Sequence, residues 1–255
     1  MLFWTEGVIV TDTQEPARPG IARMGSVVLD VPDLTAASRF WTALTGGEIS
    51  SQDDHWVSTR TADGWSLHFQ VAPDLIPPDW PGQDRPQQLH LDLRTADVAA
   101  ASRAAVQRGA TVLRVSEQWT TLTDPAGHPF DLCAAEGNPG TTVAGVNFDV
   151  PDAHTAVRFW SALIGEPVAY DQDGMGMTGG DRPILFQQVE NYTAPAWPDP
   201  ARPQQGHLDL YVDDLDATEE ATLALGATRL PSDGETFRTF ADPAGHPFCL
   251  CLNEE

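Results

Sequence analysis

The 255-residue chain carries 37 Asp and Glu against 14 Lys and Arg, a net charge of -23 at pH 7. Every cation is an arginine, which excludes Schiff-base chemistry and a phosphate-loop lysine. An acidic surface repels phosphate backbones and anionic lipids, so neither nucleic acid nor membrane is an expected partner. The three cysteines form no CxxC pair and no run of 18 apolar residues occurs, which favours a cytoplasmic protein without disulfides or a spanning helix.

An internal repeat organises the chain. Five segments recur in the same order, separated by between 117 residues (His90 to His207) and 119 residues (Val31 to Val150). A period this long indicates a duplicated domain rather than a solenoid, with domains at 21–136 and 141–255 after an N-terminal arm at 1–20. The recurring segments are Val-Pro-Asp (from 31 and 150), Arg-Phe-Trp (39 and 158), Arg-Pro-Gln-Gln (85 and 202), His-Leu-Asp-Leu (90 and 207) and Asp-Pro-Ala-Gly-His-Pro-Phe (124 and 242).

In chain order, each copy predicts a strand, a helix and short strands, twice over. Alternating residues 26–31 predict a strand, and Pro32-Asp33 begin a helix that ends at Gly46-Gly47. The apolar stripe of that helix includes Phe40 and Trp41. The other predicted elements of this copy are strands 56–61, 66–71, 89–93, 111–115, 119–123 and 129–133, and a helix at 97–108.

These units and motifs resemble the vicinal oxygen chelate superfamily, the glyoxalase, bleomycin-resistance and dioxygenase-like proteins, in a tandem two-domain form. The resemblance rests on Val-Pro-Asp at the first strand–helix junction, His-Leu-Asp-Leu opening the second unit and Asp-Pro-Ala-Gly closing it. It implies an α+β fold in which each domain has two βαβββ units that form a cup-shaped mixed sheet with helices outside. It specifies the fold better than the reaction.

Strand alternation predicts which side chains face the hollow of each cup. In Leu89–Leu93 the three leucines share one face, so His90 and Asp92 point into the hollow. The same alternation places further polar side chains there: Ser26, Asp30, His68, Gln70, Asp131, Asn147, Gln187, His207 and Asp209, together with Cys249 and Cys251.

The resemblance implies metal ligands at four such positions in each copy. In the first copy they are Ser26, His68, His90 and Asp131, of which the last three suit one divalent Fe, Zn or Mn ion. Asp30 or Asp92 would then be the catalytic base. In the second copy they are Gly145, Leu185, His207 and Cys249, where glycine and leucine cannot bind metal.

Alternatives to this metal site stay open. The histidine at 90 recurs at 207, so it could serve structure, hydrogen-bonded to the paired glutamines of the Arg-Pro-Gln-Gln segment. His207 with Cys249 and Cys251 could instead hold Zn. No glutamate occupies an inward position, whereas the resemblance implies glutamates for typical glyoxalase I activity, which is therefore not expected.

Trp80 and Trp197 lie in equivalent proline-rich loops and could stack on a planar ligand or simply pack as connectors. The leading interpretation is a resistance or sequestration protein, monomeric or homodimeric, that binds a small planar or apolar molecule. The alternative is a metal-dependent lyase, isomerase or dioxygenase acting on vicinal oxygens in domain 1. An anionic ligand is disfavoured unless arginines line the cup, and the sequence shows no such cluster. The expected ligand contacts are Ser26, Gln70, Trp80, Asn147, Gln187, Trp197, His207 and Asp209.

Overall fold

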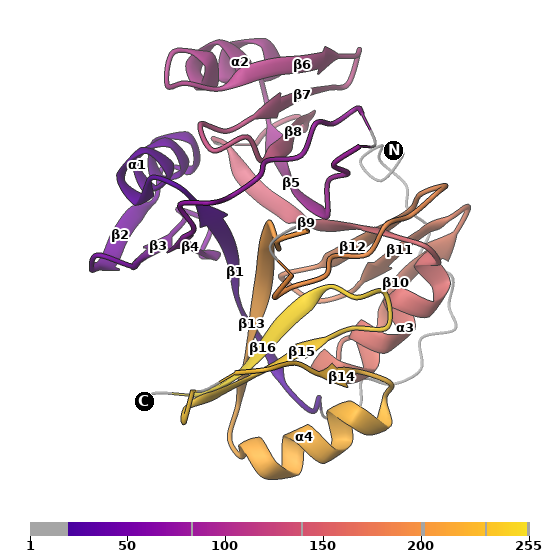
Figure 1. Cartoon of the computed structure of the whole chain (residues 1–255). Helices are drawn as coiled ribbons and strands as arrows, with labels where there is room; N and C mark the ends of the chain where they lie inside the picture. Colours follow the sequence, from indigo (N-terminus) through magenta and orange to yellow (C-terminus); the bar gives the residue numbers. More distant parts are fainter. Residues whose placement is uncertain (1–19, 83, 139, 200–201, 233, 254–255) are drawn as a thin grey trace. The chain divides into compact units, whose positions relative to one another are not determined.

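The computed structural model describes residues 20–82, 84–138, 140–199, 202–232 and 234–253. The predicted arm at 1–20 lies outside this part of the chain except for Gly20. The predicted fold class is confirmed, because the described residues form an α+β structure of four helices and two eight-stranded mixed sheets (Figure 1). None of the helices formed by these residues is long and apolar enough to cross a membrane.

The first copy forms two helices and eight strands. The edge strand at 48–52 was not predicted. All five of its residues are exposed, and its one apolar residue, Ile49, gives no alternation of apolar and polar positions. The elements are β1 (Arg23–Val31), α1 (Leu34–Thr45), β2 (Glu48–Gln52), β3 (Trp56–Arg60), β4 (Ser66–Val71), β5 (Leu89–Thr95), α2 (Val98–Val106), β6 (Thr111–Val115), β7 (Trp119–Thr123) and β8 (Pro129–Ala134).

The second copy repeats this order. Its elements are β9 (Thr142–Val150), α3 (Ala153–Ile164), β10 (Val168–Gln172), β11 (Met175–Thr178), β12 (Ile184–Gln188), β13 (Gly206–Val212), α4 (Leu215–Ala224), β14 (Thr228–Arg229), β15 (Phe237–Ala241) and β16 (Pro247–Leu252).

Aspartates begin all four helices. The carboxylates of Asp33, Asp97, Asp152 and Asp214 each accept a hydrogen bond from a first-turn backbone amide. The first helix of each copy ends at a glycine in the left-handed region, Gly46 (φ 65°) or Gly165 (φ 74°), a conformation that disfavours other residues. The chain therefore encodes the same strand–helix junction four times.

The strand order shows which βαβββ units share a sheet. It is β14-β15-β16-β13-β1-β4-β3-β2 in one sheet and β10-β11-β12-β9-β5-β8-β7-β6 in the other. The first βαβββ unit therefore shares a sheet with the fourth, and the second shares a sheet with the third. This corrects the expectation that the two βαβββ units of one copy form a sheet together. Equivalent strands have equivalent edges in every unit, so local sequence does not select the partner strand.

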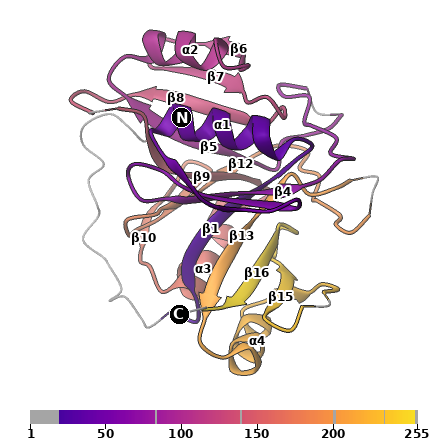
Figure 2. The same ribbon diagram turned by 90° about the vertical axis from the view of Figure 1, so that its left-hand side faces the viewer.

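By backbone contacts the described chain divides into two compact units. The first unit contains residues 28–146, and the second unit contains residues 20–27 and 147–253. In the first unit α1 covers β3 and β4 while α2 packs on β7 and β8 (Figure 1). In the second unit α3 packs on β11 and β12 (Figure 1), and α4 lies beside β16 (Figure 2).

A buried tryptophan–aspartate pair joins the two halves of each unit. Trp41 Nε1 donates to Asp124 Oδ2 at 2.9 Å, and Trp160 Nε1 donates to Asp242 Oδ2 at 3.0 Å. Both aspartates also accept backbone amide hydrogen bonds within the Asp-Pro-Ala-Gly-His-Pro turn. The repeated Phe-Trp and Asp-Pro-Ala-Gly-His-Pro segments thus meet in the core. There the rings of Trp41 and Phe130 pack edge-on, with 5.2 Å between the ring centres.

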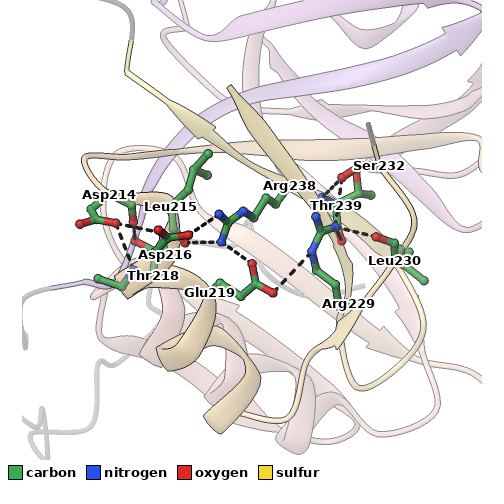
Figure 3. Close-up of polar contacts among 11 residues, drawn as sticks. Asp214, Leu215, Asp216, Thr218, Glu219, Arg229, Leu230, Ser232, Arg238 and Thr239 are labelled. Atoms are coloured by element: carbon green, nitrogen blue, oxygen red, sulfur yellow. Dashed lines mark hydrogen bonds and ion pairs between the residues drawn. The ribbon is translucent and has the colours of Figure 1, made fainter. Parts of the chain in front are cut away.

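The second unit has an ion-pair network that ties α4 to the sheet (Figure 3). Arg238 of β15 pairs with Asp216 and Glu219 of α4, and Arg229 Nε lies 3.6 Å from Glu219 Oε1. Arg229 also donates to the backbone oxygens of Leu230 at 2.6 Å and Thr239 at 2.9 Å. Both arginines therefore form ion pairs with α4, and Arg229 also donates hydrogen bonds to backbone oxygens at the edge of the sheet.

Candidate functional site

The polar face of β5 and β8 carries three ionisable side chains that lie close together. The strands are parallel and place Asp92 opposite Asp131 and Leu91 opposite Phe130. The leucines and Phe130 are fully buried on the helix side, so the alternate positions put His90, Asp92 and Asp131 together on the other face. This is the face that strand alternation predicts to be polar.

His90, Asp92 and Asp131 form a compact donor group. Each offers one ligand atom, and these atoms all lie within 4.8 Å of one another. The residues are 5%, 1% and 5% exposed. His90 Nε2 lies 3.6 Å from Asp92 Oδ1. The structure thus brings His90 and Asp131 together, with Asp92 as the third member.

His68, the remaining residue of the expected metal set, lies elsewhere. It is half-buried on β4, in the other sheet, with its ring 5.5 Å from the ring of Trp56. It is not a member of either donor group found among the described residues. The sheet order explains this, because β4 and β5 follow one another in sequence but belong to different sheets.

Gln87 orients the imidazole of His90. Its side-chain nitrogen lies 3.2 Å from His90 Nδ1, and both side chains are buried. Donation from this amide nitrogen leaves the ring proton on Nε2, facing Asp92. With the amide turned over, its oxygen accepts from Nδ1 and the Nε2 lone pair becomes available to a metal. The sequence analysis named this contact, a hydrogen bond between the histidine and the paired glutamines of the Arg-Pro-Gln-Gln segment, as an alternative to a metal site.

The surroundings of Asp131 disfavour the charged form of its carboxyl group. Its pKa is raised to about 6 in total, because burial and the neighbouring Asp92 raise it by more than His90, a hydrogen bond from Thr121 and Arg114 lower it. Its Oδ1 atom is inaccessible to solvent and has no hydrogen-bond partner within the described residues. A buried carboxylate oxygen without a partner, beside a second carboxylate and an imidazole, fits the donor chemistry of a divalent cation.

Cations and an aromatic ring flank this group on the same face, which the sequence analysis missed. Cross-strand register places Thr121 of β7 beside Asp131 and Arg114 of β6 beside Thr121. Two positions further along, Arg94 lies opposite Cys133, and Cys133 opposite Trp119. The Arg114 guanidinium carbon lies 6.0 Å from the centre of the Trp119 ring.

The second unit has an equivalent donor group with a different third member. His207, Asp209 and Cys249 also offer ligand atoms within 4.8 Å of one another. His207 Nε2 lies 3.4 Å from Asp209 Oδ1, and Gln204 Nε2 lies 3.4 Å from His207 Nδ1. Burial lowers the pKa of His207, but hydrogen bonds to Asp209 and Cys249 outweigh it and raise that pKa well above its usual range.

The hydroxyl of Ser26, a further expected contact residue, belongs to this second group. Ser26 Oγ donates to Asp209 Oδ2 at 3.2 Å. Thr239 Oγ1 lies 3.6 Å from Cys249 Sγ, as Thr121 neighbours Asp131 in the first unit. Cys251 lies opposite Tyr211 on the same face, and burial with Asp209 and Cys249 raises the pKa of its thiol.

The other expected site residues lie on β1, β4, β9 and β12 and in two connecting loops. Asp30 is buried on β1, and Gln70 is half-buried on β4. Asn147 is buried on β9, while Gln187 of β12 donates from Nε2 to Asp149 Oδ1 at 2.5 Å. Trp80 and Trp197 are half-buried in the equivalent connecting loops.

Comparison with known families identifies the class of the protein. Residues 26–133 and 145–251 both match the model of the glyoxalase-like domain. Since the two matches cover most of the chain, the protein belongs to the glyoxalase-like domain family and contains two copies of that domain. This confirms the sequence-based resemblance.

Solved structures agree on the fold. Glyoxalase I from Zea mays is 17% identical, with a TM-score of 0.66 over 91% of this chain and 92% of that chain. A putative dioxygenase from Bacillus subtilis is 10% identical, with a TM-score of 0.61 over 93% of this chain and 87% of that chain. No curated protein sequence matches. At these identities the likeness shows a shared fold and not a shared activity.

Proposed function

We propose that the chain binds a small organic molecule through a divalent cation held by His90, Asp92 and Asp131. The observation that carries the proposal is the convergence of an imidazole and two carboxylates, with their ligand atoms within 4.8 Å. Two hard oxygen donors and one nitrogen donor suit Mn, Fe or Zn. The ligand class is a molecule with two adjacent oxygen atoms, the class that the family resemblance implies.

The residues of the group would divide the work. Gln87 fixes the ring of His90, and Thr121 donates a hydrogen bond to Asp131, so both ligands are held in place by neighbours. The two carboxylates would neutralise the charge of the ion. When bound, the ion would act as a Lewis acid toward a carbonyl or enolate oxygen.

Proton transfer by Asp30 or Asp92 stays a prediction. Asp92 belongs to the donor group itself, whereas Asp30 lies on β1 in the other sheet. A residue that binds the ion through one carboxylate oxygen retains the second for a proton. On this geometry Asp92 is the better placed of the two.

Metal-free binding of a planar or apolar molecule is the second candidate function. It is favoured by Trp80 and Trp197, whose half-buried rings lie in matching loops of the two copies. It predicts quenching of tryptophan fluorescence by planar aromatic molecules in protein stripped of metal.

Metal binding by protein purified without a histidine tag separates these functions. After removal of metal with EDTA, Mn²⁺ is titrated and followed by water-proton relaxation. We expect Asp131→Asn, which preserves side-chain volume, to lose one equivalent of bound Mn²⁺, and Asp149→Asn, a buried carboxylate outside both donor groups, to retain it. Absence of saturable binding, or equal binding by the wild type and Asp131→Asn, would contradict the proposed function.

A further inference from the structure

Two arginines, 20 positions apart in sequence, lie on the same polar face as the first donor group. Arg114 follows Thr121 and Asp131 in one cross-strand row, and Arg94 lies two residues beyond Asp92 on β5. Arg114 interacts electrostatically with Asp131, and Arg94 with Asp92. On β5, β6, β7 and β8 the face therefore combines two acidic and two basic side chains with one imidazole.

Exposure changes along this face. His90, Asp92 and Asp131 are buried, Arg94 and Trp119 are half-buried, and Arg114 is exposed. Burial lowers the pKa of Arg94, so its positive charge lies in a partly desolvated place where charge interactions are stronger than in water. On these strands, exposure to solvent therefore increases from the donor group toward Trp119 and Arg114.

The charged side chains on these strands indicate the charge of the ligand that would bind after a cation. Without a cation, the charges of Asp92 and Asp131 are offset by those of Arg94 and Arg114. A divalent cation engages both carboxylates and leaves the face with an excess of positive charge, which a small anion would compensate. Arginine also matches a planar carboxylate with two parallel hydrogen bonds.

We propose that the ligand of this site is a small carboxylate with an adjacent oxygen atom, such as a 2-oxo or 2-hydroxy acid. Its acid group binds against Arg94 and Arg114 beside the Trp119 ring, and it binds after the cation. The proposal rests on the proposed function. The sequence analysis disfavoured an anionic ligand unless arginines line the cup, and Arg94 and Arg114, which the sequence did not group together, share one face of the folded sheet.

The second unit provides an internal contrast. The residue of the equivalent face that corresponds to Arg94 is Tyr211, and the one that corresponds to Trp119 is Phe237. Arg229 and Arg238 lie nearby but are bonded to Glu219 and to backbone oxygens at the α4 side of the sheet (Figure 3). Selection for an anion is therefore expected from the first unit alone.

Two probes of the same shape test the proposal. Pyruvate is an anion with adjacent carboxylate and ketone oxygens, and pyruvamide is its neutral counterpart. Their affinities are measured by calorimetry on the metal-free and Mn²⁺-loaded full-length protein. We expect the loaded wild type to bind pyruvate at least about tenfold more tightly than pyruvamide, and the metal-free protein to show no such preference.

Variants then identify the residues responsible. Arg114→Gln, at an exposed position that tolerates substitution, and Arg94→Gln should each reduce the preference for pyruvate to about threefold or less while retaining Mn²⁺. Arg158→Gln, an exposed arginine on α3, should leave it unchanged. Mn²⁺ binding without a preference for pyruvate, or a preference that survives both substitutions, would overturn this inference alone. Failure of Mn²⁺ to bind would overturn the proposed function and this inference with it.

Discussion

The polar faces of β5–β8 and β13–β16 share a framework and differ in their chemistry. Both have a His-x-Asp strand, and in both a glutamine three residues before the histidine lies against its Nδ1 atom. The member from the last strand differs, since Asp131 in the first unit corresponds to Cys249 in the second. The duplicated fold has thus kept the residues that orient the imidazole while changing a ligand atom from oxygen to sulfur and replacing Arg94 by Tyr211.

Removal of the buried aspartates tests what the two units share. Asp124→Ala and Asp242→Ala each leave a buried Trp Nε1 and two backbone amides without their acceptor. We expect each substitution to lower the free energy of unfolding by about 3–5 kcal/mol. Urea denaturation measures this, with Asp33→Ala, an exposed helix cap expected to cost about 1 kcal/mol, as control. A cost of under about 1 kcal/mol in either unit would show that the pair is not a common stabilising element.

The effect at Asp242 should also depend on pH. Burial raises the pKa of this carboxyl, but His246 and the hydrogen bonds from His246 and Trp160 outweigh it, and the pKa is lowered. The lowered pKa means that its contribution is complete above the unfolded-state value of about 3.9 and is lost as pH falls through the folded-state pKa. The difference in urea midpoint between wild type and Asp242→Ala should therefore be constant from pH 7 to about 5 and shrink at lower pH.

Exchange of the differing ligand tests whether it sets metal preference. Asp131→Cys replaces a hard oxygen by a soft sulfur, so Mn²⁺ affinity should fall about 100-fold while Zn²⁺ affinity changes by less than about tenfold. Cys249→Asp should introduce measurable Mn²⁺ binding at the second group. Calorimetric titration of each ion checks both variants, and equal losses for the two ions would refute this role of the ligand atom.

Gln87 tests the orientation of His90. Gln87→Leu removes the partner of Nδ1 and should weaken Mn²⁺ binding by about 10- to 100-fold. Gln87→Glu supplies only acceptors, which places the ring proton on Nδ1 and should retain or strengthen binding. Gln204→Leu, the matching change in the second unit, should leave Mn²⁺ binding at the first group unaltered. Weakening by Glu as great as by Leu would contradict the proposed role of the glutamine.

The network around Arg238 marks a smaller difference between the units. Its side chain and that of Glu219 are only 24% and 25% exposed, so the pair is better shielded than most surface pairs. Arg238→Met should lower the free energy of unfolding by less than the loss of either buried aspartate, and the loss should be smaller at high salt. A loss that does not change with salt would indicate packing rather than charge as its cause.

Much of the architecture followed from the sequence, because it depends on local chemistry that is repeated. Aspartates before each helix, alternating strands and the Asp-Pro-Ala-Gly-His-Pro turn predicted nearly every element, and the duplication made each prediction twice. The exposed strand β2 was missed since its polar residues do not alternate. Alternation also predicted that His90, Asp92 and Asp131 share a face.

The partners of these residues depended on the tertiary structure. Strand β4 follows the same local rules whether it shares a sheet with β5 or not, so His68 could be assigned an inward direction but not its neighbours. Arg94 and Arg114 are distant in sequence, and only the register of four strands aligns them with the donor group. The sequence by itself determined the repeated units, their faces and the buried framework, because neighbouring residues set dihedral preference and polarity. The tertiary structure alone decided which βαβββ units share a sheet and which charged residues lie side by side. The reason is that the pairing of strands with equivalent edges is selected by packing over the whole chain.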